Sequence, residues 1–192
     1  MNAGAPLATS ESDESIAEKI QRGQHQYFGE ILIRYEAKIK RYARRFLTDP
    51  KDAEDAAQEA FIKAYRNIQS FDTSRKFSSW LYRIAHNECI NFLRKRKTES
   101  LPLFDLDVLF PHLAREEHLD DMNVRQTKEE IELALSRLDP KYREPLILYY
   151  LEGFDYREIA DILHIPVATV GVRLARGRKI LKNFYEQLTG IK

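Results

Sequence analysis

Residues 71–97 read FDTSRKFSSWLYRIAHNECINFLRKRK, and they decide the fold of the N-terminal part of the chain. After a polar loop at Asp72–Lys76, apolar residues return with a period close to 3.6 and predict a helix: Leu81, Ile84, Ala85 and Phe92. The spacings of Arg83, Asn87 and Arg94 align them on the opposite face. Positive charge, aromatic rings and an amide on one face suit unstacked bases. A solvated basic helix that packs its Trp and Phe into a core is the alternative.

Two more helices are predicted before this stretch. The first has a basic face and an apolar stripe, at Phe28, Ile31, Leu32, Tyr35, Ile39, Tyr42, Ala43 and Phe46. The pair Asp49-Pro50 starts the second, because Asp is a good N-cap and Pro fits the first helical position. Small residues recur from Ala53 to Ile68, which predicts close packing against both neighbouring helices. We therefore expect a compact helical domain that ends near Lys97.

The C-terminal part repeats these start signals. Ordered structure is expected to resume near Thr127, and Asp139-Pro140 again reads as a cap followed by proline. The helix from Pro140 to Leu151 is almost wholly apolar at its end, so it should be central. Pro145 lies one turn inside it, removes one backbone hydrogen bond and is expected to kink it. Asp155–Glu158 has the form of a capping box for the next helix.

The segment Tyr156–Arg176 fits a helix-turn-helix. Ala160 is small where two helices must nearly touch, His164-Ile165-Pro166 makes the turn, and Val170 packs back onto the first helix. The second helix then exposes a basic face that would enter the major groove of DNA, with Thr169, Arg173, Arg176, Arg178 and Lys179. A helical hairpin with a basic face is the alternative.

The net charge of +1 conceals an uneven distribution of charged residues. Residues 75–97 hold seven bases and one acid, residues 98–132 hold ten acids and three bases, and residues 166–192 hold six bases and one acid. This order predicts two polyanion-binding surfaces, joined by a segment that does not bind polyanions.

Several classes of protein are disfavoured by what the sequence contains. The five histidines show no metal-ligand spacing, and the single cysteine, Cys89, has neither a disulfide partner nor an evident activating group. We therefore expect no enzymatic activity, no metal, no cofactor and no small-molecule substrate. A single cysteine, which can form no internal disulfide, fits a reducing cytoplasm. No apolar run approaches the roughly 18 residues that span a bilayer, so we expect no membrane insertion.

With both parts in view, the chain resembles bacterial sigma factors. DAEDAAQEAFIKAYRNI at 52–68 and FSSWLYRIAHNECINFLRKRK at 77–97 look like their second conserved region. LDPKYREPLILYYLEGFDYREIADILHIPVATVGVRLARGRK at 138–179 looks like their fourth. Because no first or third domain is recognisable, the resemblance is to the extracytoplasmic-function group.

The resemblance implies an all-α fold of two small helical domains joined by a long linker. We expect a flexible N-terminal tail at 1–20, a region 2 domain at 21–97, an acidic and apolar linker at 98–126, and a region 4 domain at 127–192. A linker of about 29 residues reaches roughly 96–104 Å when extended. Two promoter elements two DNA turns apart are separated by roughly 70 Å, so the linker can span them.

The family also implies partners and site residues. Core RNA polymerase would be bound by an acidic helix face, with Asp52, Asp55, Gln58, Glu59 and Phe61. The promoter −10 element would be melted and recognised by Phe71, Arg75, Lys76, Phe77, Trp80, Arg83, Asn87 and Arg94. The −35 duplex would be read by Arg157, Thr169, Val172, Arg173, Arg176, Arg178 and Lys179. An anti-sigma factor that masks both DNA surfaces is a further implied partner.

The reading helix departs from the family pattern. Gly171, Val172 and Ala175 stand where members often carry polar, basic or aromatic residues, so no −35 sequence can be inferred. Two other functional classes remain open at this stage. One is a helix-turn-helix regulator that acts without polymerase, and it would leave residues 71–97 unexplained. The other is a pure protein-interaction module with solvated basic faces.

Overall fold

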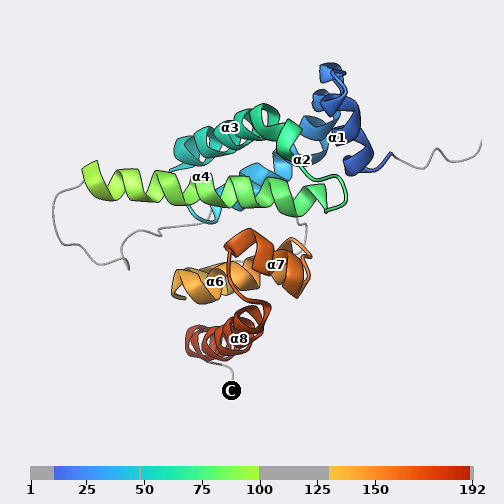
Figure 1. The fold of residues 1–192 in the computed structure, drawn as a ribbon. Coiled ribbons are helices and arrows are strands. Elements are labelled where there is room, and N and C mark those ends of the chain that lie inside the picture. Colours follow the sequence, from blue (N-terminus) through green and yellow to red (C-terminus); the bar gives the residue numbers. More distant parts are fainter. Residues whose placement is uncertain (1–10, 48, 100–129, 191–192) are drawn as a thin grey trace, which may run out of the picture.

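In the computed structural model, all regular structure of the described residues, 11–47, 49–99 and 130–190, is helical (Figure 1). The N-terminal half contains α1 (Asp13–Gln21), η1 (His25–Tyr27), α2 (Phe28–Arg44), α3 (Pro50–Asn67), η2 (Ile68–Ser70) and α4 (Phe77–Glu99). The C-terminal half contains a helical segment at 130–136, then α6 (Pro140–Leu146), η4 (Ile147–Leu151), α7 (Tyr156–Leu163) and α8 (Val167–Thr189). The predicted all-α fold is confirmed.

Helix α3 packs against both α2 and α4 in the N-terminal half. Its contact faces are made of alanines, none more than 1% exposed: Ala53, Ala56, Ala57, Ala60 and Ala64. Such small side chains let helix axes approach closely, as the sequence predicts. Asp49 caps α3 as expected, because its side chain accepts a hydrogen bond from the Lys51 N–H at 2.9 Å.

Helix α1 differs from the expectation of a flexible tail over residues 1–20. Ser12 caps it by accepting a hydrogen bond from the Ser15 N–H at 3.2 Å, and Ile16, Ala17 and Ile20 are fully buried. Three apolar residues in a nine-residue helix make the segment look polar in composition. Its stabilisation comes from packing on α2 and α4, which local sequence does not reveal.

The helix predicted from Pro140 to Leu151 changes its hydrogen-bond register halfway. Helix α6 ends at Leu146, and η4 continues as a π-helix in which the Glu152 N–H donates to the Ile147 carbonyl at 3.1 Å. Pro145 stands directly before the change and has no N–H to donate, so one ordinary helical bond is missing there. The expected kink therefore takes the form of a π-turn.

The predicted helix-turn-helix consists of α7 and the first part of α8. Asp155 and Glu158 form both bonds of a capping box at the start of α7. His164 ends the helix in the left-handed conformation at φ 52°, a conformation that histidine adopts more readily than branched residues. Val170 of α8 is fully buried and Ala160 is 9% exposed, as expected of residues at the helix crossing.

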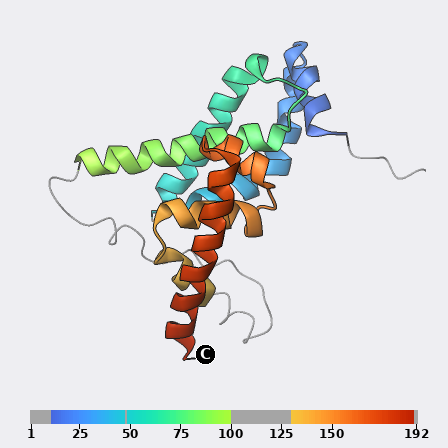
Figure 2. The same cartoon turned by 60° about the horizontal axis from the view of Figure 1, so that its bottom comes forward.

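The two halves pack against each other through α4 and α7. In Figure 1, α3 lies on one side of α4, while α6, α7 and α8 lie on the other. The end of α8 points away from the N-terminal half (Figure 2). The predicted linker at 98–126 falls largely outside the described residues, and only its first two residues are seen, at the end of α4.

Candidate nucleic-acid and polymerase interfaces

The loop before α4 is held by short-range hydrogen bonds. The Asp72 carboxylate accepts from the Ser74 N–H at 3.0 Å and from the Ser74 hydroxyl at 2.7 Å. These bonds lower the pKa of Asp72 below its usual value, because they favour the ionised form. The next two residues, Arg75 and Lys76, are exposed. The loop is thus a fixed turn that presents two cations.

Helix α1 fixes this loop from behind. The Gln21 side-chain amide donates to the Ile68 carbonyl at 2.7 Å and to the Phe71 carbonyl at 2.8 Å. The Glu14 carboxylate accepts from the Phe77 N–H at 2.9 Å, and so satisfies a free donor at the start of α4. Sequence reasoning missed both residues. The helical spacing of Ile16 and Ile20 is the signal that could have indicated α1.

The aromatic residues of the predicted −10 surface do not all face solvent. Phe71 is 5% exposed and Phe77 is fully buried, which corrects the expectation that both rings contact DNA. Their centroids lie 5.1 and 5.5 Å from that of Trp80, which is partly exposed. Trp80 is therefore the ring available for stacking on a base, and the two phenylalanines support it.

The polar stripe on α4 is placed as predicted. Asn87 and Arg94 are exposed and Arg83 is partly exposed, all on the helix that follows the loop. Next to this stripe, the buried carboxylate of Glu88 accepts a hydrogen bond from Lys63 of α3 at 2.8 Å. That ion pair joins α3 to α4 and fixes the orientation of the stripe.

The acidic face of α3 is open to solvent in its middle. Asp55 and Gln58 are exposed, while Asp52 and Glu59 are partly exposed. Phe61 is only 7% exposed and lies on the packed face of α3, so its ring is not part of the exposed acidic face on which the sequence placed it. Its role is to hold α3 against its neighbours.

The reading face of α8 carries most of the predicted −35 residues. Arg176, Arg178 and Lys179 are exposed, and Val172 is 50% exposed. Thr169 and Arg173 of the same helix are partly exposed, and Arg157 is exposed on α7. The Arg178 guanidinium donates to the Tyr150 hydroxyl at 3.4 Å, so this arginine also contacts η4.

Among the described residues, no cluster of His, Cys, Asp or Glu is suited to hold a metal ion. In the same part of the chain, none of the helices has the length and apolar character needed to cross a membrane. Burial raises the pKa of the Cys89 thiol well above its usual value, which keeps it protonated and unreactive.

Comparison with known proteins accounts for both halves. The family model "Sigma-70 region 2" matches residues 31–99, and "Sigma-70, region 4" matches residues 128–181. The chain is 37% identical over 175 residues to the ECF RNA polymerase sigma factor SigW of Bacillus subtilis, a match covering 85% of this chain and 91% of that protein. It is 32% identical to the RNA polymerase sigma-H factor of Pseudomonas aeruginosa, with 95% and 98% covered.

A solved structure agrees with these matches. The sigma factor RpoE of Bartonella quintana, crystallised with the anti-sigma factor NepR, superposes with a TM-score of 0.66 at 25% identity and covers 83% of this chain and 96% of that chain. The chain therefore belongs to the ECF sigma factors of bacterial RNA polymerase. It is an initiation factor that directs RNA polymerase, and not an enzyme. The family assignment also excludes the alternative of a helix-turn-helix regulator that acts without polymerase, since region 2 accounts for residues 71–97.

Proposed function

We propose that the exposed stripe of α4 and the loop before it melt and recognise the −10 element. The observation that carries this assignment is Asn87, an exposed amide in line with Arg83 and Arg94 and on the same helix as the partly exposed Trp80. The arginines bind phosphates, Trp80 stacks on a base, and Asn87 reads a base edge. Unstacking costs a few kcal/mol per base and stacking on an aromatic ring returns roughly 1–3, so melting is close to balance.

The other surfaces complete the assignment. The basic face of α8 binds the −35 duplex, with Arg176 as an exposed arginine of the helix-turn-helix. The acidic face of α3 docks on a basic surface of core RNA polymerase, because opposite potentials steer and orient association. Residues 21–97 and 127–192 act as the two functional domains. The protein works in the cytoplasm and is held inactive by an anti-sigma factor, as RpoE is bound by NepR in the related complex.

Run-off transcription tests this function directly. The purified chain is added to core polymerase on a library of promoter fragments, and new initiation at a subset of promoters is expected. Asn87→Ala should weaken binding of single-stranded −10 DNA roughly tenfold, since a lost amide–base contact is worth about 1–3 kcal/mol. Asn183→Ala is the matched control, because Asn183 is an exposed amide on α8. If Asn87→Ala instead lost core binding and kept its −10 binding, the assignment of Asn87 to the −10 element would be wrong.

A further inference from the structure

We propose that the chain recognises the −35 duplex through the 5-methyl groups of thymines, which contact an apolar stripe on the exposed face of α8. The stripe consists of Ala168, Val172 and Ala175, and the ring of Tyr156 lies beside it. This inference rests on the proposed function, because it names the chemical feature of DNA that the reading face of α8 contacts. It concerns the bases alone, since the neighbouring arginines bind the phosphates.

Helix α8 carries two apolar stripes, one buried and one exposed. The buried stripe has spacings of four and seven residues and consists of Val170, Leu174 and Gly177. Ala168, Val172 and Ala175 repeat these spacings and are exposed, so they form a second line along the helix. A surface helix normally carries polar or charged residues opposite its buried face. Packing within the chain therefore does not account for the exposed stripe.

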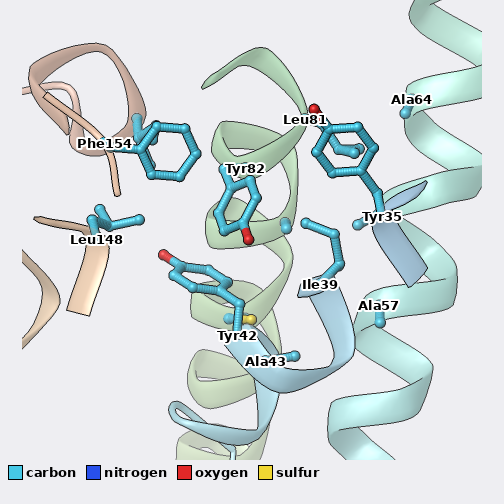
Figure 3. Packing of buried hydrophobic residues seen from close by; sticks show 14 of the residues in the cluster. Tyr35, Ile39, Tyr42, Ala43, Ala57, Ala64, Leu81, Tyr82, Leu148 and Phe154 are labelled. Atoms are coloured by element: carbon cyan, nitrogen blue, oxygen red, sulfur yellow. The ribbon is translucent and has the colours of Figure 1, made fainter. Parts of the chain in front are cut away.

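The exposed stripe is separate from the buried core. Figure 3 shows Leu148 and Phe154 of the C-terminal half inside the buried cluster, where neither is more than 6% exposed. Val172 is by contrast 50% exposed, and Val167 in the first turn of α8 is 45% exposed. Single apolar residues on a surface are ordinary, but several on one helix face mark a site of contact with another molecule.

Tyr156 of α7 extends this apolar surface, because Gly171 has no side chain. A Cβ atom at Gly171 would lie 3.6 Å from the Tyr156 Cε2 atom, so the ring lies directly against the backbone of α8. The ring is 38% exposed, and an edge-to-face contact with Tyr149, with centroids 5.5 Å apart, holds it in place. Glycine at position 171 therefore lets an aromatic ring border the stripe, next to Val172 along the chain.

The charge around the stripe favours DNA over a protein as its partner. From Val167 to Ile180, α8 has four basic residues and no acidic one. Arg176 and Lys179 are exposed and follow Val172 at spacings of four and seven residues, so the apolar stripe continues directly into a line of positive charge. This arrangement fits a duplex, because the major groove presents base edges between two rows of phosphates.

The side chains of the stripe select one feature of the base edges. Alanine and valine neither donate nor accept a hydrogen bond, so they cannot read the polar groups of guanine, cytosine or adenine. The 5-methyl group of thymine is the apolar feature of the major groove, and apolar side chains contact it. Ala168 and Ala175 lie about 10 Å apart along the helix, which corresponds to about three base pairs. We therefore expect thymines at about three neighbouring base pairs, on either strand.

The test uses the full chain bound to core polymerase. Duplexes that this complex binds are selected from a pool with random upstream positions. Thymines of the selected duplex are then replaced one at a time by deoxyuridine, which lacks only the 5-methyl group. We expect a group of thymines at about three neighbouring base pairs, and each replacement within it should weaken binding about fourfold, the factor for one buried methyl group. The protein is the same throughout this comparison, so its folding does not affect the result.

Two variants connect the effect of deoxyuridine to the stripe. Val172→Ala removes two methyl groups from an exposed side chain, so the loss at one position of the group should fall below about twofold. Leu133→Ala is the matched control and should keep the full loss, because Leu133 is 44% exposed on the helical segment at 130–136, outside α8. Tyr156→Ala should reduce the loss at the edge of the group, whereas Tyr156→Phe, which keeps the ring, should not.

Several results would overturn methyl recognition. One is a selected duplex without grouped thymines, and another is unchanged binding after every replacement. A loss that persists in full in Val172→Ala would mean that the methyl groups act through the stiffness of the DNA and not through the stripe. Weaker binding of core polymerase by Val172→Ala, with the full loss kept, would assign the stripe to polymerase instead. Selection of a specific duplex without a methyl effect rejects only this inference, whereas no upstream selection at all rejects the proposed −35 function as well.

Discussion

At Gly177, a missing methyl group sets the distance between α6 and α8. A Cβ atom there would lie 3.1 Å from the Leu146 Cδ1 atom and 3.1 Å from the Tyr142 carbonyl oxygen. The carbonyl belongs to the backbone of α6, so it cannot move aside without shifting that helix. Gly177 is buried, whereas a Cβ atom at Gly171 would meet only the Tyr156 ring, at an ordinary 3.6 Å.

Gly177→Ala should lower the free energy of unfolding by about 1 kcal/mol. Alanine gains about 1 kcal/mol in helix propensity, but overpacking costs roughly 1–3 kcal/mol and outweighs it. Gly171→Ala, with space for a methyl group, should instead stabilise the chain by up to about 1 kcal/mol. Urea denaturation of both variants measures the difference. Equal stabilisation by the two substitutions would show that α6 can shift away from the added methyl group without cost.

Single residues also mark how far the sequence alone can predict a site. The periodicity of residues 71–97 placed Asn87 and Arg94 on an exposed face, and the structure agrees. The same pattern could not tell that Phe71 and Phe77 face inward. Both residues flank a loop outside the regular helical period, and their backbone is held by hydrogen bonds from α1, far away in sequence.

At the scale of elements, α8 has two tasks. Its basic face carries the arginines that we propose bind the −35 duplex, and its buried face, with Val170 and Leu174, packs on α6 and α7. Arg173 also acts inside the C-terminal half. The hydrogen bonds from Lys141 lower the pKa of Asp139 and the charge of Arg173 adds to them, while Arg143 first and Arg173 second oppose the rise that burial causes in the pKa of Glu144. Arg176 is exposed and does not contribute to the pKa shifts of Asp139 and Glu144, so its substitution is the more specific test of DNA binding.

Arg176→Ala should weaken binding of −35 duplex DNA and reduce the slope of log K against log salt by about 0.9, the value for one phosphate contact. Arg173→Ala should do the same and also lower stability. Lys182→Ala is the control, because Lys182 is an exposed cation on the same helix that pairs with Glu186. Fluorescence anisotropy at several salt concentrations measures each slope. An unchanged slope for both arginine variants would contradict the assigned reading face.

Elements with strong end signals are the ones that sequence predicts well. The sequence predicts the starts of α3 and α6 from an Asp cap followed by proline, and the start of α7 from its capping box. Each signal depends on residues within four positions of one another. Helix α1 and the π-turn at Ile147–Leu151 were not. The first depends on distant packing, and the second on a change of register that periodicity does not encode.

At the scale of the whole molecule, two titratable groups, the partly buried Glu144 and the buried His86, sit near the contact between the halves. Burial raises the pKa of Glu144 from 4.5 to about 7. Burial is also the main cause that raises the pKa values of Tyr42 and Cys89 in the N-terminal half, and the charge of Glu144 adds to both. Burial first, and the charge of His164 second, lower the pKa of His86 from 6.5 to about 4. The two shifts have opposite effects on stability as pH changes.

Glu144→Gln should stabilise the chain at pH 8 by about 2 kcal/mol and leave it unchanged near pH 4.5. A raised folded pKa means that stability is full below 4.5 and is lost as pH rises through about 7, because the ionised carboxylate must be buried. His86 acts in the other direction, with stability lost as pH falls from 6.5 toward 4.

Denaturation of wild type and Glu144→Gln in parallel at each pH cancels the His86 contribution. The difference between the two proteins should grow between pH 4.5 and 7 and then level off. A difference independent of pH would mean that Glu144 titrates normally.

The packing of the two halves could not be predicted from the sequence. Its residues include Glu152, Glu144 and Phe154, which look like ordinary helix and helix-end residues until α4 is placed beside them.

The bond from the Phe77 N–H to Glu14 has a practical consequence for dissecting the protein. The family model begins at residue 31, so a fragment trimmed to that boundary lacks α1 entirely. Such a fragment would leave the first amide of α4 without an acceptor and uncover the apolar side chains that Ile16 and Ile20 protect. Fragments intended for isolated study should begin no later than residue 11, and a fusion partner belongs upstream of Ser12, the residue that caps α1.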